Sequence, residues 1–359
     1  MIVAIGTGLF ATNNFIYMIW KLNLLVIIKM SQKGLSLLRQ KEKKKMLSVL
    51  EVKRKLPKNF VEKLYESYTP LTVDKILAGM AGDRNTTLRG NNIKSNIQEV
   101  MKKLKEYGIK FERVPWYVDA LVIKNVKEKQ IQDLEMYNDG EIYLQSLSSM
   151  VPPLVLNPKP NEKVLDLTAA PGSKTTQMAA MMQNKGYILA NELDELRCER
   201  LKYNVEKQGA TIIEVNNGRG EVIGKKYENC FDKVLLDAPC SGEGRFLAND
   251  AKTYRNWSER TVKELAKLQK KLLKSAYQAL KPSGELIYST CTLNREENEE
   301  ILEWALSELE GLKLENINLE IKNAIKGISD NKEVEKAIKI LPSKDTEGFF
   351  VARFKKLPL

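Results

Sequence analysis

The sequence predicts an α/β protein, in which an open, mostly parallel sheet carries helices on both faces and a small α+β domain precedes it. Two patterns lead to this prediction. From Lys163 onward, short apolar segments alternate regularly with longer amphipathic ones, which is typical of βαβ units. Between Thr86 and Ile123, a strand-like segment is followed by a helix and two more strand-like segments. With 359 residues, 43% of them hydrophobic, the chain is long enough for both domains.

Residues 1–55 precede this pattern as an apolar and then Lys-rich extension. Lys21 is the only charged residue in the apolar part up to position 28, which is long enough to span a bilayer. The segment lacks the basic start and the small-residue cleavage site of a signal peptide. Three interpretations stay open for residues 1–29: a membrane anchor, an ordered apolar segment on the domain, or translation upstream of a functional start at Met30. We favour the last of these over membrane contact.

The net charge of +12 is concentrated in the first part of the chain. Residues 1–58 hold twelve lysines and arginines against two glutamates, so residues 59–359 carry only about +2. A basic arm over residues 31–55 suits contact with nucleic-acid phosphates, but a solvated tail explains it equally well. The charge therefore says little about the partners of the globular part.

Residues 56–138 are expected to form the small α+β domain. Apolar spacing predicts, in order, helices at Phe60–Tyr68 and Leu71–Met80, a strand at Thr86–Asn91, a helix at Ile97–Tyr107, and strands at Lys110–Val114 and Ala120–Ile123. Prolines bracket the first helix, and Gly108 is placed to end the third.

Residues 139–359 are expected to form the open sheet and its helices. Strands are predicted at Lys163–Thr168, Tyr187–Asn191, Thr211–Val215, Phe231–Leu236, Glu285–Ser289 and Phe349–Phe354. Helices are predicted between them at Ser173–Met182, Glu195–Gln208, Glu259–Leu280 and Glu296–Leu309. In such sheets, ligands bind beyond the carboxyl ends of the strands, at the point where the strand order reverses.

The composition excludes several kinds of chemistry. The chain has no histidine, which rules out Ser-His-Asp and Cys-His catalysis and any His-ligated zinc. The four cysteines, at positions 198, 230, 240 and 291, show no Cys-x-x-Cys spacing, so we expect neither a metal site nor a disulfide framework. So few cysteines in so long a chain are typical of a reducing compartment, and we expect a cytoplasmic protein.

A glycine turn follows the first strand of the second domain, in the segment DLTAAPGSKT that begins at Asp166. Such a turn at the start of a helix presents backbone N–H groups to a ligand. A phosphate-binding P-loop would need a glycine where Leu167 stands, and a GxGxxG loop needs more than the single Gly172. The turn therefore favours a cofactor without phosphate, with an ordinary strand–helix turn as the alternative.

Glu192 ends the second strand of this domain. A carboxylate at that place can accept hydrogen bonds from both hydroxyls of a ribose. Because no phosphate-binding loop accompanies it, a nucleoside cofactor such as S-adenosylmethionine fits better than NAD. Taken alone, Glu192 would be a solvated helix-capping carboxylate, and Arg197 on the next helix would belong to a surface salt bridge.

Two cysteines follow two consecutive strands. The fourth strand runs into Asp237-Ala-Pro-Cys240, and the fifth runs into Ser-Thr-Cys291. If these strands are neighbours, about 4.8 Å apart, then Asp237, Cys240 and Cys291 meet at one edge of the sheet. A single buried cysteine is usually an inert hydrophobic side chain. Two of them at successive strand ends indicate a reactive site.

The motifs DLTAAPGSKTTQMA, ANELDELRCERL, LLDAPCSGEGRF and YSTCTLNREENEEIL resemble those of the Nol/Nop/Sun family of RNA cytosine-5 methyltransferases. IYLQSLSSMVPPLVLNPKPNEKVLDL resembles the entry to that family's catalytic domain, TLRGNNIK its amino-terminal RNA-binding module, and EGFFVARFKK its last strand. The resemblance extends over about residues 56–359. It implies a Rossmann-like, S-adenosylmethionine-dependent methyltransferase domain at 139–359, behind a small RRM-like RNA-binding domain at 56–138.

The resemblance also implies a role for each motif residue. Cys291 would be the nucleophile, Cys240 would assist product release, and Asp237 would contact the target base. Asn217 stands where the family carries an acidic residue after the third strand; an amide there can still bond to adenine. The residues that would hold the cofactor are Thr168, Ala169, Ala170, Pro171, Gly172, Ser173, Lys174, Glu192, Arg197, Asn217 and Asp237.

These residue types suit the methylation of cytosine at C5. C5 is too weak a nucleophile to take a methyl group directly, and a thiolate that adds to C6 turns C5 into an enamine carbon. The thiol must be ionised for this step, whereas a free cysteine has a pKa of about 8.5. Asp237 can hydrogen-bond the N3/N4 edge of the cytosine. Cys240, a carboxylate or water must then be the general base that takes the C5 proton. Because the base must leave its stack, we expect an RNA loop or a flipped base as the substrate.

Other functions stay open at this point. A DNA cytosine-5 methyltransferase would use Pro239-Cys240 as its nucleophile and would leave Cys291 without a role. An amino-group methyltransferase usually carries an Asn/Asp-Pro-Pro-aromatic turn, which this chain lacks. A non-catalytic RNA-binding or ribosome-assembly factor could retain the same fold. Among RNA substrates we prefer tRNA to rRNA, because the chain has only one small amino-terminal module, and we expect a monomer.

Overall fold

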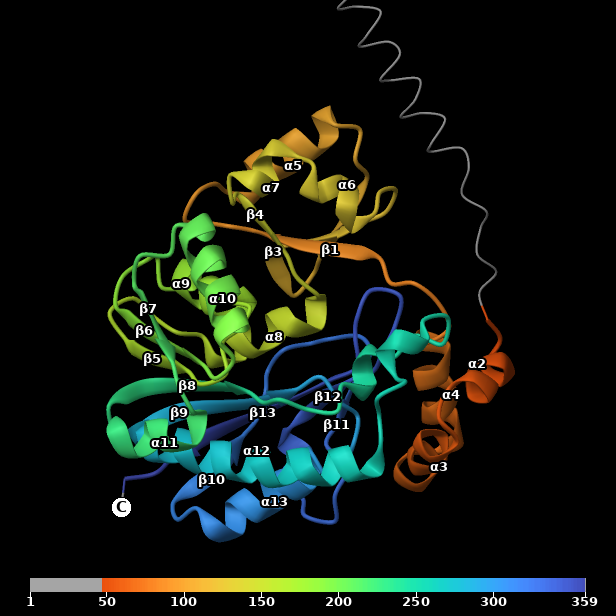
Figure 1. Cartoon of the computed structure of the whole chain (residues 1–359), viewed down its shortest axis with the longest axis vertical. Helices are drawn as coiled ribbons and strands as arrows, with labels where there is room; N and C mark the ends of the chain where they lie inside the picture. Colours follow the sequence, from red (N-terminus) through yellow and green to blue (C-terminus); the bar gives the residue numbers. More distant parts are fainter. Residues whose placement is uncertain (1–46, 359) are drawn as a thin grey trace, which may run out of the picture. The chain divides into compact units, whose positions relative to one another are not determined.

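The computed structural model describes residues 47–358, so the predictions made for residues 1–29 lie outside the described part of the chain. Two sheets organise the described residues, one with four strands and one with nine (Figure 1). None of the helices between residues 47 and 358 has the length and apolar character that crossing a membrane requires.

The four-stranded sheet is antiparallel throughout. Its strand order is β2-β3-β1-β4, with β1 (Thr86–Gly90), β2 (Phe111–Val114), β3 (Tyr117–Ile123) and β4 (Ile142–Leu144). One face packs against α5 (Ile97–Glu106), α6 (Glu128–Gln132) and α7 (Glu135–Asn138). The apolar residues of α5 recur at helical spacing, so one side of this helix is buried on the sheet.

The small sheet takes one strand from beyond the expected residues 56–138. Its fourth strand, β4, lies beyond position 138 and pairs with β1, because Leu88 stands opposite Leu144 in the antiparallel register. Three amino-terminal helices, α2 (Val49–Lys55), α3 (Lys58–Ser67) and α4 (Pro70–Gly79), form one apolar cluster with Phe246, Ala248, Leu293 and Leu341 of the larger domain. Their apolar sides therefore belong to the larger domain, and part of the segment 1–55 belongs to the fold.

The nine-stranded sheet contains the parallel strands predicted from the sequence. Its order is β11-β12-β13-β9-β8-β5-β6-β7, and β10 pairs with β13. The five parallel strands are β5 (Lys163–Asp166), β6 (Tyr187–Glu192), β7 (Ile213–Asn217), β8 (Phe231–Asp237) and β9 (Leu280–Thr290). The strand order reverses between β5 and β8, so the carboxyl ends of these two strands mark the place where a ligand is expected.

Antiparallel strands extend this sheet beyond β9. They are β10 (Leu312–Glu315), β11 (Ala324–Lys326), β12 (Ile338–Ile340) and β13 (Phe349–Lys356). Phe350 of β13 stands opposite Thr290 of β9, which precedes Cys291. The predicted last strand is therefore a partner of the strand that carries the candidate nucleophile.

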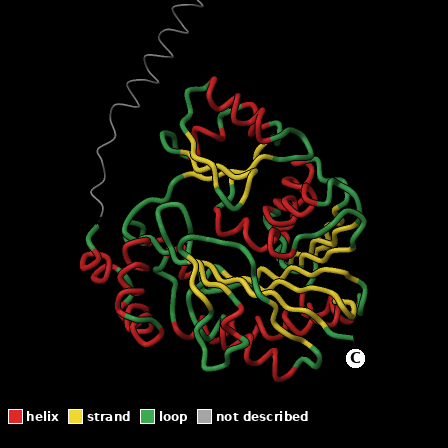
Figure 2. Tube along the Cα trace, turned by 180° about the vertical axis from the view of Figure 1, so that it is seen from behind, coloured by secondary structure: helices red, strands yellow, loops and turns green. Residues whose placement is uncertain are grey.

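Helices cover both faces of the large sheet (Figure 2). On one face lie α11 (Gly220–Lys226), α12 (Glu259–Ala279) and α13 (Glu299–Glu308), below the sheet in Figure 1. On the other face lie α8 (Leu147–Leu156), α9 (Ser173–Met181) and α10 (Glu195–Gln208). The small sheet rests its second face on α8, where Tyr117 and Val122 pack against Leu147 and Met150. This doubly covered, mostly parallel sheet has the predicted architecture.

Candidate active site

The structure brings the two motif cysteines together at the carboxyl edge of β8 and β9. The Sγ atoms of Cys240 and Cys291 lie 3.1 Å apart, and the backbone N–H of Cys291 donates to the Cys240 sulfur over 3.2 Å. Both side chains are partly exposed, and both thiols are free. β8 and β9 are parallel neighbours with Asp237 opposite Ser289, so the turn after each strand starts at the same level. The expected meeting of Asp237, Cys240 and Cys291 is what the structure shows.

The two thiols have different electrostatic surroundings. The hydrogen bond to Cys291, followed by burial, holds the pKa of Cys240 well above its ordinary value. The raised pKa favours the protonated form of Cys240, which can then donate toward the Cys291 sulfur. Arg245 lies on the other side of Cys291: the charge of Cys291 is the largest cause of the raised pKa of the Arg245 guanidinium, which also hydrogen-bonds to that sulfur. Arg245 thus places a positive charge next to the Cys291 sulfur.

The loop that carries Arg245 is held by backbone contacts. The N–H of Gly244 donates to the carbonyl of Cys291 over 3.0 Å, and the N–H of Gly348 donates to the carbonyl of Gly244 over 2.9 Å. Arg84 donates to the carbonyls of Gly244 and Phe246, at 3.0 and 3.4 Å. The segment between the two domains thus fixes the loop next to the cysteines. Sequence reasoning assigned no role to Arg84 or Arg245, because their partners lie far away along the chain.

Asp237 ends β8 with both carboxylate oxygens occupied. Ser289 donates to Oδ1 over 2.7 Å, and Lys174 donates to Oδ2 over 2.7 Å. The Lys174 ammonium also bonds to the hydroxyl of Ser149, 2.8 Å away. Lys174 was expected among the cofactor residues, and the structure places its charged end on Asp237, on the side of the cysteines. Lys174 and Asp237 therefore act as one ion pair.

The glycine turn connects β5 to α9 and is fixed from several sides. Thr168 donates from its hydroxyl to the carbonyl of Asp237 over 2.8 Å, and the Arg197 guanidinium donates to the carbonyl of Ala170 over 2.7 Å. Gly172 caps α9 with a φ of +102°, and an added Cβ would lie 2.9 Å from Leu201. Only glycine combines this backbone conformation with so close a neighbour. The turn residues 168–173 thus form a preformed backbone cradle next to the end of β6.

Glu192 lies beside this turn and is almost fully buried, at 4% exposure. It accepts hydrogen bonds from the backbone N–H groups of Ala170 and Asp194, at 3.3 and 3.1 Å. It also forms an ion pair with Arg197 at 3.4 Å. Arg197 is therefore a clamp between the turn and Glu192. Asn217, at the end of β7, donates its amide to the carbonyl of Glu192 over 2.9 Å. The turn, Glu192, Arg197 and Asn217 form one connected group at the edge of the sheet.

Asp166, at the end of β5, has an unsatisfied carboxylate. Its Oδ2 accepts from the hydroxyl of Thr175 over 2.7 Å, whereas the buried Oδ1 has no hydrogen-bond partner among the described residues. Burial raises the pKa of this carboxyl to about 7. A buried carboxylate oxygen needs a hydrogen-bond donor. The ammonium group of an amino-acid moiety is such a donor. The donor set therefore fits S-adenosylmethionine: backbone amides at the turn, a carboxylate for the ribose and an acceptor for the ammonium group.

The small domain reaches this group through Arg89 of β1. Its guanidinium is fully buried and donates to Gln145 at 2.9 Å, to the hydroxyl of Thr176 at 2.8 Å and to the carbonyl of Ser173 at 3.2 Å. Ser173 and Thr176 belong to the first turn of α9, directly after the glycine turn. The strand in the TLRGNNIK motif is therefore tied to the cofactor-side helix by a buried cation.

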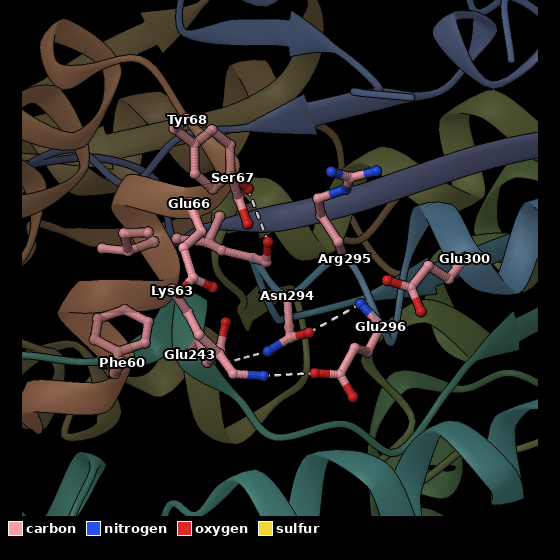
Figure 3. Close-up of a pocket in the computed structure, with 12 residues that line it drawn as sticks. Phe60, Lys63, Glu66, Ser67, Tyr68, Glu243, Asn294, Arg295, Glu296 and Glu300 are labelled. Atoms are coloured by element: carbon pink, nitrogen blue, oxygen red, sulfur yellow. Dashed lines mark hydrogen bonds and ion pairs between the residues drawn. The ribbon is translucent and has the colours of Figure 1, made fainter. Parts of the chain in front are cut away.

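A cavity of about 240 Å³ lies behind the loop that follows Cys291 (Figure 3). α3 forms one wall and the segment Leu293–Glu296 the other. Lys63 of α3 pairs with Glu296 at 2.5 Å, and Asn294 donates to the buried Glu243 at 3.0 Å, as the dashed lines show. The amino-terminal helices thus pack against the loop that follows Cys291. Between residues 47 and 358, no group of three or more acidic or cysteine side chains is placed to hold a metal ion.

Comparison with known proteins identifies the same two parts of the chain. A family model described as 16S rRNA methyltransferase RsmB/F matches residues 153–355. A second model, described as the ferredoxin-like domain of RsmF/B-like methyltransferases, matches residues 56–128. The latter is an α+β module, which agrees with the predicted class of the small domain.

Curated relatives name two kinds of RNA substrate. A "tRNA (cytosine(49)-C(5))-methyltransferase" of Pyrococcus abyssi is 40% identical over 307 residues, which cover 83% of this chain and 97% of that protein. A "Ribosomal RNA small subunit methyltransferase F" of Klebsiella pneumoniae is 36% identical over 293 residues. That match covers 80% of this chain but only 60% of the relative, so the chain spans less than two thirds of it.

A solved structure shares the fold. A methyltransferase homologue from Pyrococcus horikoshii superimposes with a TM-score of 0.75 at 31% identity, covering 86% of this chain and 99% of that one. The predicted fold class, a Rossmann-like methyltransferase sheet behind a small α+β domain, is confirmed by these matches.

Proposed function

Because the chain belongs to the RsmB/F family of RNA methyltransferases, in agreement with the motif resemblance, we propose that it transfers a methyl group to C5 of cytosine in tRNA. The observation that carries the proposal is the pair of sulfur atoms, 3.1 Å apart, at the edge of the sheet where the cofactor turn also ends. tRNA is preferred to rRNA because the relative named for tRNA is matched over 97% of its length, whereas the relative named for rRNA is matched over only 60%. rRNA remains the second candidate.

The cofactor proposed for this site is S-adenosylmethionine, which supplies an electrophilic methyl group when bound. The turn residues 168–173 would meet its amino-acid part with backbone N–H groups, and the free oxygen of Asp166 would accept from its ammonium group. Glu192, fixed by Arg197, would accept from the ribose hydroxyls. Asn217 lies beside Glu192 and would face the adenine side.

Catalysis begins at Cys291 in this proposal. The Cys291 thiolate, which has the Arg245 guanidinium beside it, adds to C6 of the cytosine and moves the C5–C6 electron pair onto C5. Asp237, held between Ser289 and Lys174, accepts from the N4 amino group of the base and, when protonated, donates to N3, where negative charge develops. C5, covalently tied to the enzyme through C6, would then take the methyl group that bound S-adenosylmethionine supplies, and the electron pair of the broken methyl–sulfur bond would stay on the cofactor's sulfur.

Product release needs Cys240. The C5 proton passes to water, the C5–C6 double bond forms again, and the bond between C6 and the Cys291 sulfur breaks with its electron pair returning to sulfur. Cys240 keeps its own proton and points it at that sulfur, so it stabilises the departing thiolate. Because Cys240 is protonated, water suits the role of base better than Cys240 does.

Two other functions are tested by simple measurements. A DNA cytosine-5 methyltransferase would give methylated DNA and would tolerate loss of Cys291. A non-catalytic RNA-binding factor would leave RNA methylation unchanged when its gene is deleted. Bisulfite sequencing of total RNA from cells with and without this protein separates these cases. We expect 5-methylcytosine at one or a few tRNA positions to disappear with the protein, and unchanged RNA would overturn the proposal.

A further inference from the structure

A fully buried carboxyl group, Glu297, lies behind the two cysteines. Its exposed fraction is 0%, and it follows the nucleophile loop just before α13. The backbone N–H of Ser241 donates to Oε1 over 2.9 Å, and the hydroxyl of Ser241 donates to Oε2 over 2.5 Å. Gln269 of α12 also donates to Oε1, at 3.0 Å. The proposed function gives this group no role.

The contacts of Glu297 reach the residues that follow both cysteines. Ser241 is the residue after Cys240, and its hydroxyl lies 2.8 Å from the hydroxyl of Thr292, the residue after Cys291. Gln269 also donates to the carbonyl of Pro239, the residue before Cys240, over 2.9 Å. One carboxyl group thus holds both cysteine turns through two hydroxyls and an amide.

Glu297 also acts on Cys240 through its charge. Burial raises the pKa of Glu297 to about 7, with Glu243 as a further cause. The Glu297 charge is one of the causes of the raised pKa of Cys240. Other titratable groups around Glu297 are Tyr288, whose hydroxyl donates to its backbone carbonyl over 2.6 Å, and Glu243, which lines the cavity in Figure 3. Two carboxyl groups, Glu297 and Glu243, therefore lie close together beside the turn that carries Cys240.

We propose that Glu297 is a positioning residue for product release: it holds Cys240 beside Cys291 through Ser241 and Thr292, and its charge keeps Cys240 in the protonated, donating form. The inference rests on the proposed function, in which Cys240 donates toward the departing Cys291 sulfur. If the carboxyl were purely structural, glutamine could replace it: its oxygen can accept from the Ser241 N–H and from Gln269, and its NH2 can donate to the Ser241 hydroxyl. An effect of the Glu297 charge on Cys240 therefore distinguishes the proposed role from a purely structural one.

The first test needs neither RNA nor cofactor. The alkylation of Cys240 by iodoacetamide is followed against pH by mass spectrometry of the peptides that contain residues 240 and 291. In Glu297→Gln, the pH midpoint for Cys240 should move down by roughly one unit, which is about a tenfold faster reaction below the midpoint. Glu285→Gln, in the middle of β9, is the matched control and should leave the midpoint unchanged. An unchanged midpoint in a folded Glu297→Gln protein overturns the inference.

The second test uses the full reaction. Glu297→Gln should retain KM, lower kcat, and remove the inflection near pH 7 from the kcat profile, while the covalent RNA adduct persists longer at alkaline pH. Ser241→Ala keeps the carboxyl group but cuts its link to Thr292, and should also lower kcat at unchanged KM. If the wild type makes no 5-methylcytosine, the proposed function fails, whereas the alkylation result still stands. If the wild type is active and Glu297→Gln matches it in pH profile and adduct lifetime, the inference fails alone.

Discussion

Lys174 Nζ lies 2.7 Å from Asp237 Oδ2, so the helix after β5 is bonded to the end of β8. The Lys174 side chain is 9% exposed and that of Asp237 28%, so solvent screens the pair only in part. Lys174→Met leaves the carboxylate without its cation, and we expect it to lower the free energy of unfolding by about 2 kcal/mol. Urea denaturation at pH 7.5 measures this. Lys202→Met, which breaks the exposed pair with Glu199, is the control. Equal losses in the two variants would contradict the expectation.

The buried carboxyl of Asp166 predicts a pH dependence of stability. Its pKa is about 7 in the folded protein, against 3.8 as the ordinary value. Because the folded value is the higher one, protonated Asp166 favours folding below about pH 4, and this advantage is lost as the pH rises through 7. Without cofactor, the wild type should lose up to roughly 4 kcal/mol relative to Asp166→Asn between pH 4 and pH 8. Denaturation curves at several pH values measure the difference, and parallel pH dependences of the two proteins would refute it.

Arg245 is expected to set the reactivity of Cys291. Removing the guanidinium takes away the cation that favours the thiolate, so Arg245→Met should slow the alkylation of Cys291 at pH 7.5 by about tenfold. Arg245→Lys should restore part of the rate. Arg260→Met, at the exposed start of α12, is the control for loss of a positive charge. If Arg245→Met and Arg260→Met react at the same rate, Arg245 does not act on the nucleophile.

The close approach of Gly244 to Gly348 makes a fourth position testable. An added Cβ at Gly244 would lie 1.9 Å from the Gly348 carbonyl oxygen, which leaves the loop no room beside the segment before β13. Gly244→Ala should therefore lower the free energy of unfolding by about 3 kcal/mol, through overpacking. Gly82→Ala, where no atom lies within 4 Å of the added Cβ, is the control. Thermal unfolding compares the two variants, and a stability of Gly244→Ala close to that of Gly82→Ala would count against a tightly packed loop.

The parallel strands were predictable because each carries a local signal. β5, β6, β8 and the second half of β9 contain short apolar runs, and the residues that follow these strands form recognisable turns. The carboxyl ends of parallel strands share one edge of a sheet. Asp237 and the two cysteines were therefore expected to meet if the strands that precede them are neighbours. The roles of these residues in catalysis remain predictions that the experiments here are designed to test.

Other features depend on long-range contacts and could not be predicted from local patterns. α8 contains Pro152 and Pro153 inside the helix, a pair that is expected to break a helix rather than lie in one. It is held by burial between the large sheet and the small one. α2 packs through Val52 into a cluster with Phe246 and Leu341, which lie far later in the chain, so no local pattern separates α2 from the basic arm.

Buried polar groups were the hardest features to predict. Glu297, Arg89 and Gln269 lie in segments that a pattern assigns to exposed or capping positions, yet all three are fully buried. Each is stabilised by partners from a different element, as in the bonds of Arg89 to α9 and of Gln269 to the turn after β8. Their burial is a property of how the two domains and their helices close on one another, which no single segment encodes.

The division of labour between the two cysteines is tested most directly by trapping the covalent RNA adduct. Wild type, Cys291→Ser and Cys240→Ser are incubated with S-adenosylmethionine and RNA from cells that lack this protein, and the products are separated on a denaturing gel. We expect Cys240→Ser to accumulate a methylated adduct that survives denaturation, and Cys291→Ser to give neither adduct nor 5-methylcytosine. Methyl transfer by Cys291→Ser together with an inactive Cys240→Ser would contradict the assignment of Cys291 as the nucleophile.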